Sequence, residues 1–191
     1  MDIILIRHGQ TGDNVGNIFS TKETVLTEEG REHIKRTKTY VDTLSFDRVY
    51  VSPLYRAIQT MELLGLEGER DERIQEIDFG LFEGYSYEEI KENFPEESKL
   101  WDEDYINFPT PKGESIKMAY ERVTSFLEEI SKKDEDALLV CHAGVIRLAL
   151  SWVFDNLDYY FKFRVDNGSV NIISIDERGY KFIKKVNYTV E

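Results

Sequence analysis

Two of the three histidines in the sequence could do chemistry together, because each ends one of the two most apolar segments of the chain. His8 follows the apolar run over residues 2–7, and His142 closes a second run over residues 137–142. Each run is followed by a glycine-containing turn, which is typical of a buried strand ending in a tight turn. Ligands in α/β sheets bind beyond the carboxyl ends of the strands, so we expect both imidazoles at one site. His33 lies in a charged segment, and we predict that it is exposed to solvent.

Two arginines accompany these histidines and indicate an anion as the ligand. Arg7 precedes His8, and Arg56 falls in the first turn of a helix that itself follows a predicted strand. Guanidinium groups and helix N-termini both suit phosphate oxygens. A metal site made of His8, His142 and Glu83 is the alternative, but the neighbouring arginine charges disfavour bound Mg²⁺ or Zn²⁺. We therefore expect a dianion site and no metal.

The elements that position these residues follow from hydrophobic periodicity and turn signals. We predict strands over residues 2–7, 48–52, 137–142, 170–175 and 180–186, and helices over about 28–44, 53–64, 86–93, 114–133 and 145–154. Residues 71–85 are predicted to form a loop with at most one short strand, and residues 94–113 show no clear pattern. Strands that alternate with helices predict an α/β fold, a three-layer α/β/α sandwich whose mostly parallel sheet has an antiparallel edge.

Composition narrows the classes of function. The chain has 191 residues and a formal charge of −13, which disfavours a general binder of nucleic acid or of anionic membranes. No apolar run approaches the ~18 residues that a membrane helix needs, and the first residues do not resemble a signal peptide. A single cysteine excludes an internal disulfide and fits a reducing cytoplasm. We expect one domain over residues 1–191, with a homodimer left open.

Several motifs in order resemble those of the histidine phosphatase (phosphoglycerate mutase-like) superfamily. Arg7-His8-Gly9-Gln10-Thr11 is similar to the signature of that superfamily. The other matching stretches are Asn14, residues 26–30, 52–60, 76–84, 113–115 and 141–147, and Asn167. The resemblance spans nearly the whole chain, and residues 78–90 are similar to the α-ribazole phosphatases of the family.

The resemblance implies a role for each matching residue. His8 is the nucleophile that becomes phosphohistidine, and Arg7, Arg56 and His142 hold the phosphoryl oxygens. Glu83 protonates the leaving group and then acts as the base for water. We expect a raised pKa for Glu83, and a carbonyl of the Gly9 turn as the partner that orients His8. The substrate-binding residues would be Arg7, Gln10, Thr11, Asn14, Arg56, Phe82, Tyr85 and His142.

These roles imply a phosphatase that hydrolyses a small soluble phosphomonoester without cofactor or metal. A phosphoglycerate mutase is one alternative, although the chain is short for a mutase of this family. A catalytically silent module that binds a phosphorylated ligand is another, although His8 and Glu83 are intact.

The substrate itself stays open among α-ribazole phosphate, a phosphosugar and phosphoserine. We expect residues 79–113, which are rich in aromatic side chains, to cover the substrate. Acidic residues at positions 96, 97 and 102–104 would favour a neutral or cationic alcohol if they surround the entrance.

Overall fold

The run Asp2–Arg7 forms β1, a central strand whose side chains alternate between two hydrophobic cores. Ile3 and Leu5 pack on one face of the sheet, and Ile4 and Ile6 pack on the other. Both faces of a central strand are buried in such a sheet, which explains the continuous apolar sequence. The computed structural model describes residues 1–190.

The sheet has six strands in the order β3-β2-β4-β1-β5-β6. The four strands β1 to β4 run parallel, while β5 and β6 are antiparallel and form one edge. The bounds of the strands after β1 are β2 Arg48–Val51, β3 Glu69–Arg70, β4 Ala137–Cys141, β5 Val170–Ile175 and β6 Lys181–Tyr188.

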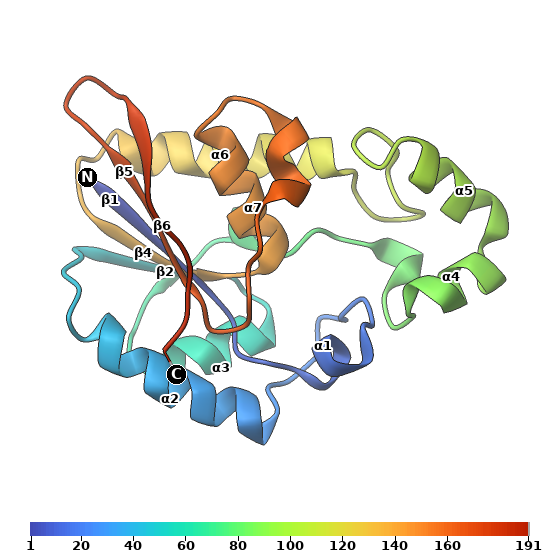
Figure 1. Cartoon of the computed structure of the whole chain (residues 1–191), viewed down its shortest axis with the longest axis horizontal. Coiled ribbons are helices and arrows are strands. Elements are labelled where there is room, and N and C mark those ends of the chain that lie inside the picture. Colours follow the sequence, from blue (N-terminus) through green and yellow to red (C-terminus); the bar gives the residue numbers. More distant parts are fainter. Residues whose placement is uncertain (191) are drawn as a thin grey trace.

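Helices cover both faces of the sheet (Figure 1). On one face lie α2 and α3, and on the other lie α6 and α7 with the short helix η3. The helices are α1 Gly12–Gly16, α2 Glu28–Val41, α3 Tyr55–Leu64, α4 Tyr87–Asn93, α5 Pro95–Glu103, α6 Ile116–Ser131 and α7 Ala143–Trp152, with 3₁₀ helices η1 Glu72–Ile74, η2 Gly80–Phe82 and η3 Leu157–Lys162. This is the predicted three-layer α/β/α sandwich with its antiparallel edge.

Some local predictions were wrong. Helix α5 was missed because acidic and aromatic side chains hide its periodicity, although Pro95 stands at its first turn, where proline favours a helix. The short strand expected within residues 71–85 lies just before them, as β3, and two 3₁₀ helices occupy the segment instead. His33 is half-buried rather than exposed, because its ring packs against the backbone at Gly168.

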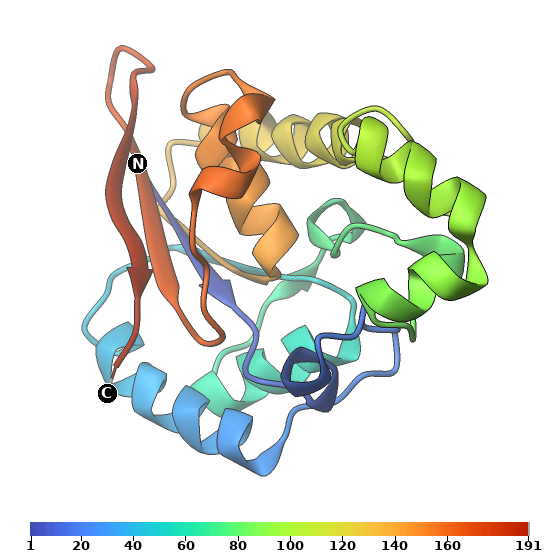
Figure 2. The ribbon, with the colours of Figure 1, turned by 45° about the vertical axis from the view of Figure 1, so that its right-hand side comes forward.

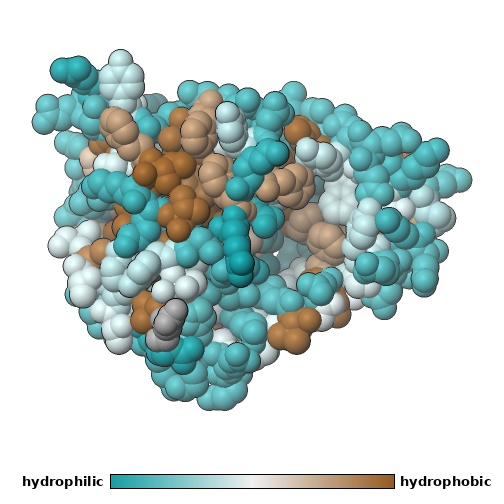
Figure 3. Space-filling view, in the orientation of Figure 1, coloured by the Kyte–Doolittle hydropathy of each residue, from teal (hydrophilic) through white to brown (hydrophobic). Residues whose placement is uncertain are grey.

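The segment that contains α4 and α5 stands beside the sheet, next to α1 (Figure 2). Trp101 attaches α5 to the rest of the molecule through edge contacts with Phe19 and Phe79. The surface is hollowed between this segment and the body of the molecule (Figure 3). No helix in residues 1–190 has both the length and the apolar character that crossing a bilayer requires.

Candidate active site

The parallel pairing of β1 with β4 brings the two predicted histidines together. Arg7 is in register with Cys141, and His8 donates its backbone N–H to the carbonyl of Cys141 at 3.0 Å. His8 and His142 each come one residue after their strand, and their ring centroids are 5.2 Å apart. The common site expected at the carboxyl end of the sheet is therefore present.

His8 is held in one protonation state and one tautomer. Burial, together with the charges of Arg56 and Arg7, holds the pKa of His8 well below its usual value. Its Nδ1 lies 2.7 Å from the carbonyl oxygen of Gly9, which can only accept, so Nδ1 must carry the proton. The neutral ring consequently keeps an unprotonated Nε2, which is the form that a nucleophile needs.

His142 is fully buried, and its surroundings keep it neutral. Burial is the main cause that holds the pKa of His142 well below its usual value, and the charge of Arg56 adds to it. Its Nε2 lies 2.7 Å from the hydroxyl oxygen of Ser52. If the Ser52 hydroxyl donates to Nε2, the proton of His142 resides on Nδ1. A neutral His142 can then donate a hydrogen bond without being protonated further.

Both arginines are fixed by backbone carbonyls. Arg7 Nη1 donates to Val165 at 2.6 Å, and Arg56 Nη1 donates to Thr21 at 2.8 Å. Burial lowers the pKa of Arg7 to about 10 and also lowers the pKa of Arg56. Guanidinium groups nevertheless stay charged at neutral pH in proteins.

Three buried nitrogen donors of this cluster lack a partner. Within residues 1–190, the buried side-chain polar atoms without a hydrogen bond are Arg7 Nε, Arg56 Nε and His142 Nδ1. Buried polar groups are nearly always satisfied, so each exception calls for an explanation. Unpartnered donors on two cations and a neutral imidazole are what an oxyanion would satisfy.

A cavity of about 130 Å³ opens onto this cluster. It is lined by Arg7, His8, Asn14, Ile18, Phe19, Ser20, Arg56, Glu76 and Phe79. We call it the inner cavity. At ~30 Å³ for each water of liquid, it has room for a group the size of a phosphate.

A second pocket, which we call the outer pocket, has a volume of about 10 Å³ and shares Ser20, Arg56 and Glu76 with the inner cavity. This outer pocket carries charges of both signs, from Lys22 and from the carboxylates of Asp78 and Glu83. Burial, together with the charge of Asp78, raises the pKa of Glu83, as predicted. A half-buried carboxyl with a raised pKa suits proton donation to a leaving group.

The acidic residues of α5 do not line either of these pockets. The two pockets therefore give no support to the expectation that these residues favour a cationic or neutral alcohol. Lys22 at the outer pocket was not singled out from the sequence, because a lysine in a polar loop carries no pattern that places it at a site.

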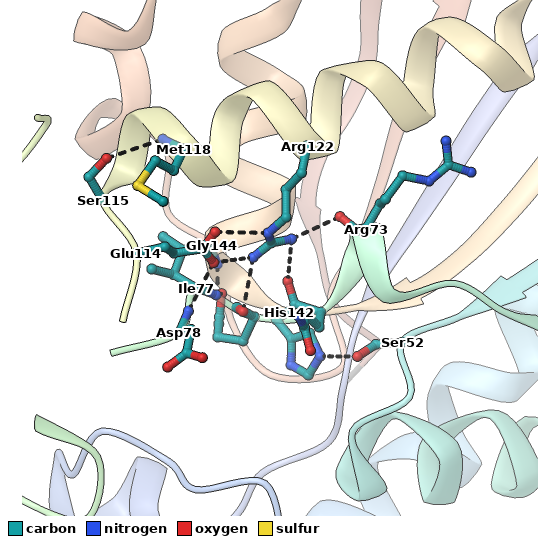
Figure 4. Close-up of polar contacts among 12 residues, drawn as sticks. Ser52, Arg73, Ile77, Asp78, Glu114, Ser115, Met118, Arg122, His142 and Gly144 are labelled. Atoms are coloured by element: carbon teal, nitrogen blue, oxygen red, sulfur yellow. Dashed lines mark hydrogen bonds and ion pairs between the residues drawn. The ribbon is translucent and has the colours of Figure 1, made fainter. Parts of the chain in front are cut away.

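A partly buried ion pair supports the loop that carries Glu76 (Figure 4). Arg122 of α6 forms a bidentate pair with Glu114, and it donates to the carbonyls of Arg73, Gln75 and Glu76 at 2.8 to 3.0 Å. Glu114 also accepts from the backbone N–H of Asp78. The pair therefore positions the chain that leads from Glu76 to the outer pocket.

Glu76 itself was part of a family-like motif but was given no role. Its Oε1 lies so close to α7 that a Cβ atom at Gly144 would come within 2.2 Å of it, so a glycine is needed there. Glu76 also lies near Arg7 and Arg56, and its negative charge opposes part of the lowering of their pKa values that burial causes. It offsets part of the positive charge of the cluster.

Five residues that we expected to bind substrate do not line either pocket. One of them is His142, which is fully buried within the cluster described above. Thr11 is fully buried and caps α1, and the side chain of Gln10 accepts from the hydroxyl of Thr27. Phe82 is also fully buried, because the 3₁₀ turn of η2 directs its ring into the aromatic contacts with Phe94 and Trp101. Tyr85 packs against Phe94. Phe82 is thus corrected to a packing residue.

Comparisons with known proteins show which proteins this chain is similar to. Phosphoserine phosphatase 1 of Hydrogenobacter thermophilus is 31% identical over 195 residues, covering 98% of this chain and 92% of that protein. The crystal structure of the α-ribazole phosphatase from Shigella flexneri superposes with a TM-score of 0.91 at 28% identity, over 98% of this chain and 96% of the other.

A human 6-phosphofructo-2-kinase/fructose-2,6-bisphosphatase 1 is 33% identical over 156 residues, and here the match covers 80% of this chain but only 32% of the longer protein. The family model of the histidine phosphatase superfamily (branch 1) matches residues 3–189. The chain therefore belongs to the histidine phosphatase superfamily.

Proposed function

We propose that this protein is a metal-independent phosphomonoesterase that works through a phosphohistidine at His8. The observation that carries the proposal is the set of three buried donors without partners, Arg7 Nε, Arg56 Nε and His142 Nδ1, beside a neutral imidazole. Such donors would hold the phosphoryl oxygens and stabilise the charge that develops in the transition state.

In the first step, His8 Nε2 attacks phosphorus while the bond between phosphorus and the ester oxygen breaks. Glu83 gives its proton to the departing oxygen, so that the product is a neutral alcohol. The Gly9 carbonyl, which accepts from His8 Nδ1–H, stabilises the positive charge that the phosphorylated ring acquires.

In the second step, the carboxylate of Glu83 takes a proton from water as the water oxygen attacks phosphorus. The bond between phosphorus and His8 Nε2 breaks, inorganic phosphate is released, and the neutral imidazole is restored. Both steps use protein groups alone, because Arg7 and Arg56 supply the positive charge that a metal ion would otherwise bring.

For the substrate, we favour a small alcohol that carries polar groups of both signs, such as phosphoserine. Support comes from the outer pocket, where Lys22 would attract a carboxylate and Asp78 would attract an ammonium group. The phosphoserine phosphatase relative, which matches nearly the full chain, supports the same choice.

A hydrolysis screen over phosphomonoesters, without added metal, tests the proposal. We expect release of phosphate from several esters, with phosphoserine among the best, and no turnover by His8→Ala. Phosphoethanolamine is the matched substrate, because it lacks only the carboxylate that Lys22 would bind. Turnover by the His8→Ala variant would refute the mechanism, and equal rates on both esters would refute the substrate assignment.

A further inference from the structure

Asn167 reaches the nucleophile from a loop that is distant in sequence. It precedes β5, and its side-chain Nδ2 lies 2.9 Å from Asn14 Oδ1, 3.2 Å from the carbonyl of His8 and 3.3 Å from the carbonyl of Gly9. The mechanism proposed above gives Asn167 no part. Its contacts nevertheless join a cavity-lining side chain to the backbone that orients the nucleophile.

The backbone around Asn167 is held firmly against β1. The N–H of Gly168 donates to the carbonyls of Arg7 and His8, and the N–H of Arg7 donates to Ser169 at 3.1 Å. Gly168 adopts φ +68, a left-handed conformation that favours glycine. Because Gly168 and Ser169 are held against β1, the amide of Asn167 has a defined position relative to Asn14.

The contact with Asn167 and the backbone N–H of Thr11 together decide which way the amide of Asn14 faces. Asn14 Oδ1 accepts from the backbone N–H of Thr11 at 3.2 Å and from Asn167, so both of its lone pairs are used. The reversed amide would place its NH₂ group against two donors, with no acceptor. The observed orientation leaves the Nδ2 of Asn14 for the inner cavity that Asn14 lines with His8.

We propose that Asn167 is a positioning residue, which locks the Asn14 amide so that its NH₂ group donates to the phosphoryl oxygens in the inner cavity. The proposal rests on the proposed function, since that function places a phosphoryl group there. The additional contact with Gly9 steadies the carbonyl that selects the tautomer of His8.

A double-mutant cycle between Asn14 and Asn167 tests the proposal, with kcat/KM for p-nitrophenyl phosphate and inhibition by vanadate as readouts. Loss of a hydrogen bond to a charged oxygen predicts a fall of about tenfold or more for Asn14→Ala. Asn167→Ala should lower kcat/KM by about threefold or more in the wild-type background. In the Asn14→Ala background the same change should lower kcat/KM by less than about twofold, because Asn167 acts through Asn14 and the two effects are then non-additive.

Asn167→Asp separates orientation from simple loss of contact. A carboxylate at this position can only accept, so it would draw the Asn14 NH₂ toward itself and turn the Asn14 oxygen toward the phosphoryl group. We expect this variant to lose more activity and more vanadate affinity than Asn167→Ala. If Asn167 had a purely structural role, Asn167→Asp, which keeps the shape of the side chain, would lose less activity than Asn167→Ala.

Asn187→Gly is the matched control for the loop. The side chain of Asn187 bonds only to Asp166, accepting from its N–H at 2.6 Å and donating to its carboxylate at 2.9 Å, and glycine tolerates the φ of 52° at this position. We expect kcat/KM within about twofold of the wild type.

Three outcomes would overturn the role of Asn167. The first is an equal loss of kcat/KM in Asn187→Gly and Asn167→Ala. The second is a loss in the Asn14 and Asn167 double variant that equals the product of the two single losses. The third is an Asn167→Asp enzyme as active as the wild type. An inactive wild-type enzyme would instead overturn the proposed function, and this inference with it.

Discussion

Replacing Arg122 with methionine should weaken both the fold and the active site. The change removes five hydrogen bonds and leaves the carboxylate of Glu114, whose side chain is 13% exposed, without its cation. Removing one partner of a buried ion pair costs about 3–5 kcal/mol, and the partial exposure places this case near 3 kcal/mol. For a chain of this size, that corresponds to a fall in Tm of about 6–12 °C.

The matched comparison is Arg73→Met, which breaks pairs with Asp71 and Glu129 at a side chain that is 33% exposed. Ion pairs near the surface contribute about 0–1 kcal/mol each, so the loss of both should lower Tm by less than about 8 °C and by less than the loss in Arg122→Met. Thermal unfolding followed by circular dichroism measures both variants, and kcat on p-nitrophenyl phosphate should fall only for Arg122→Met. Equal shifts in Tm for the two variants would refute the reasoning from burial.

Three other predictions concern the chemistry of the site. Glu83→Gln should lower kcat/KM on phosphoserine by about 10²–10⁴-fold but lower kcat/KM on p-nitrophenyl phosphate far less, since kcat/KM reports the first step, in which only the alkyl ester needs a proton donor; equal losses in kcat/KM would contradict the acid role. Because the folded pKa values of His8 and His142 lie well below 6.5, the unfolded chain binds more protons below that pH. Urea unfolding should therefore show the free energy of unfolding falling from pH 6.5 to 5.5, by up to about 1.4 kcal/mol per pH unit for each histidine. This dependence on pH should be weaker in His142→Asn. A free energy of unfolding that does not change over this range would count against neutral buried imidazoles. Activity should survive EDTA, and a loss that zinc or magnesium restores would revive a metal site.

The predictions from sequence succeeded where the determining interactions are local. The helices predicted to begin near residues 28 and 86 do begin there, because Thr27 and Ser86 cap them by accepting from the backbone N–H three residues later. Such a cap depends on only a few neighbouring positions. The strand ends at His8 and His142 were predictable for the same reason, because an apolar run followed by a glycine turn defines them.

Features that depend on distant contacts were not predictable. Arg122 reaches carbonyls that lie 46 to 49 residues earlier in the chain, and nothing in its own segment marks it as a support for the site. The ring of Phe82 belongs to a family-like motif, yet the turn that carries it points inward, and only its contacts in the fold reveal this.

Trapping the covalent intermediate tests the central claim most directly. The enzyme would be mixed with phosphate-labelled p-nitrophenyl phosphate, quenched in base, and mapped by peptide mass spectrometry. We predict acid-labile, base-stable phosphate on His8, and none in His8→Ala. In Glu83→Gln the fraction of phosphorylated His8 should rise, because the second step then lacks its base. Label on His142 or on a carboxylate, or steady turnover by His8→Ala, would contradict the account.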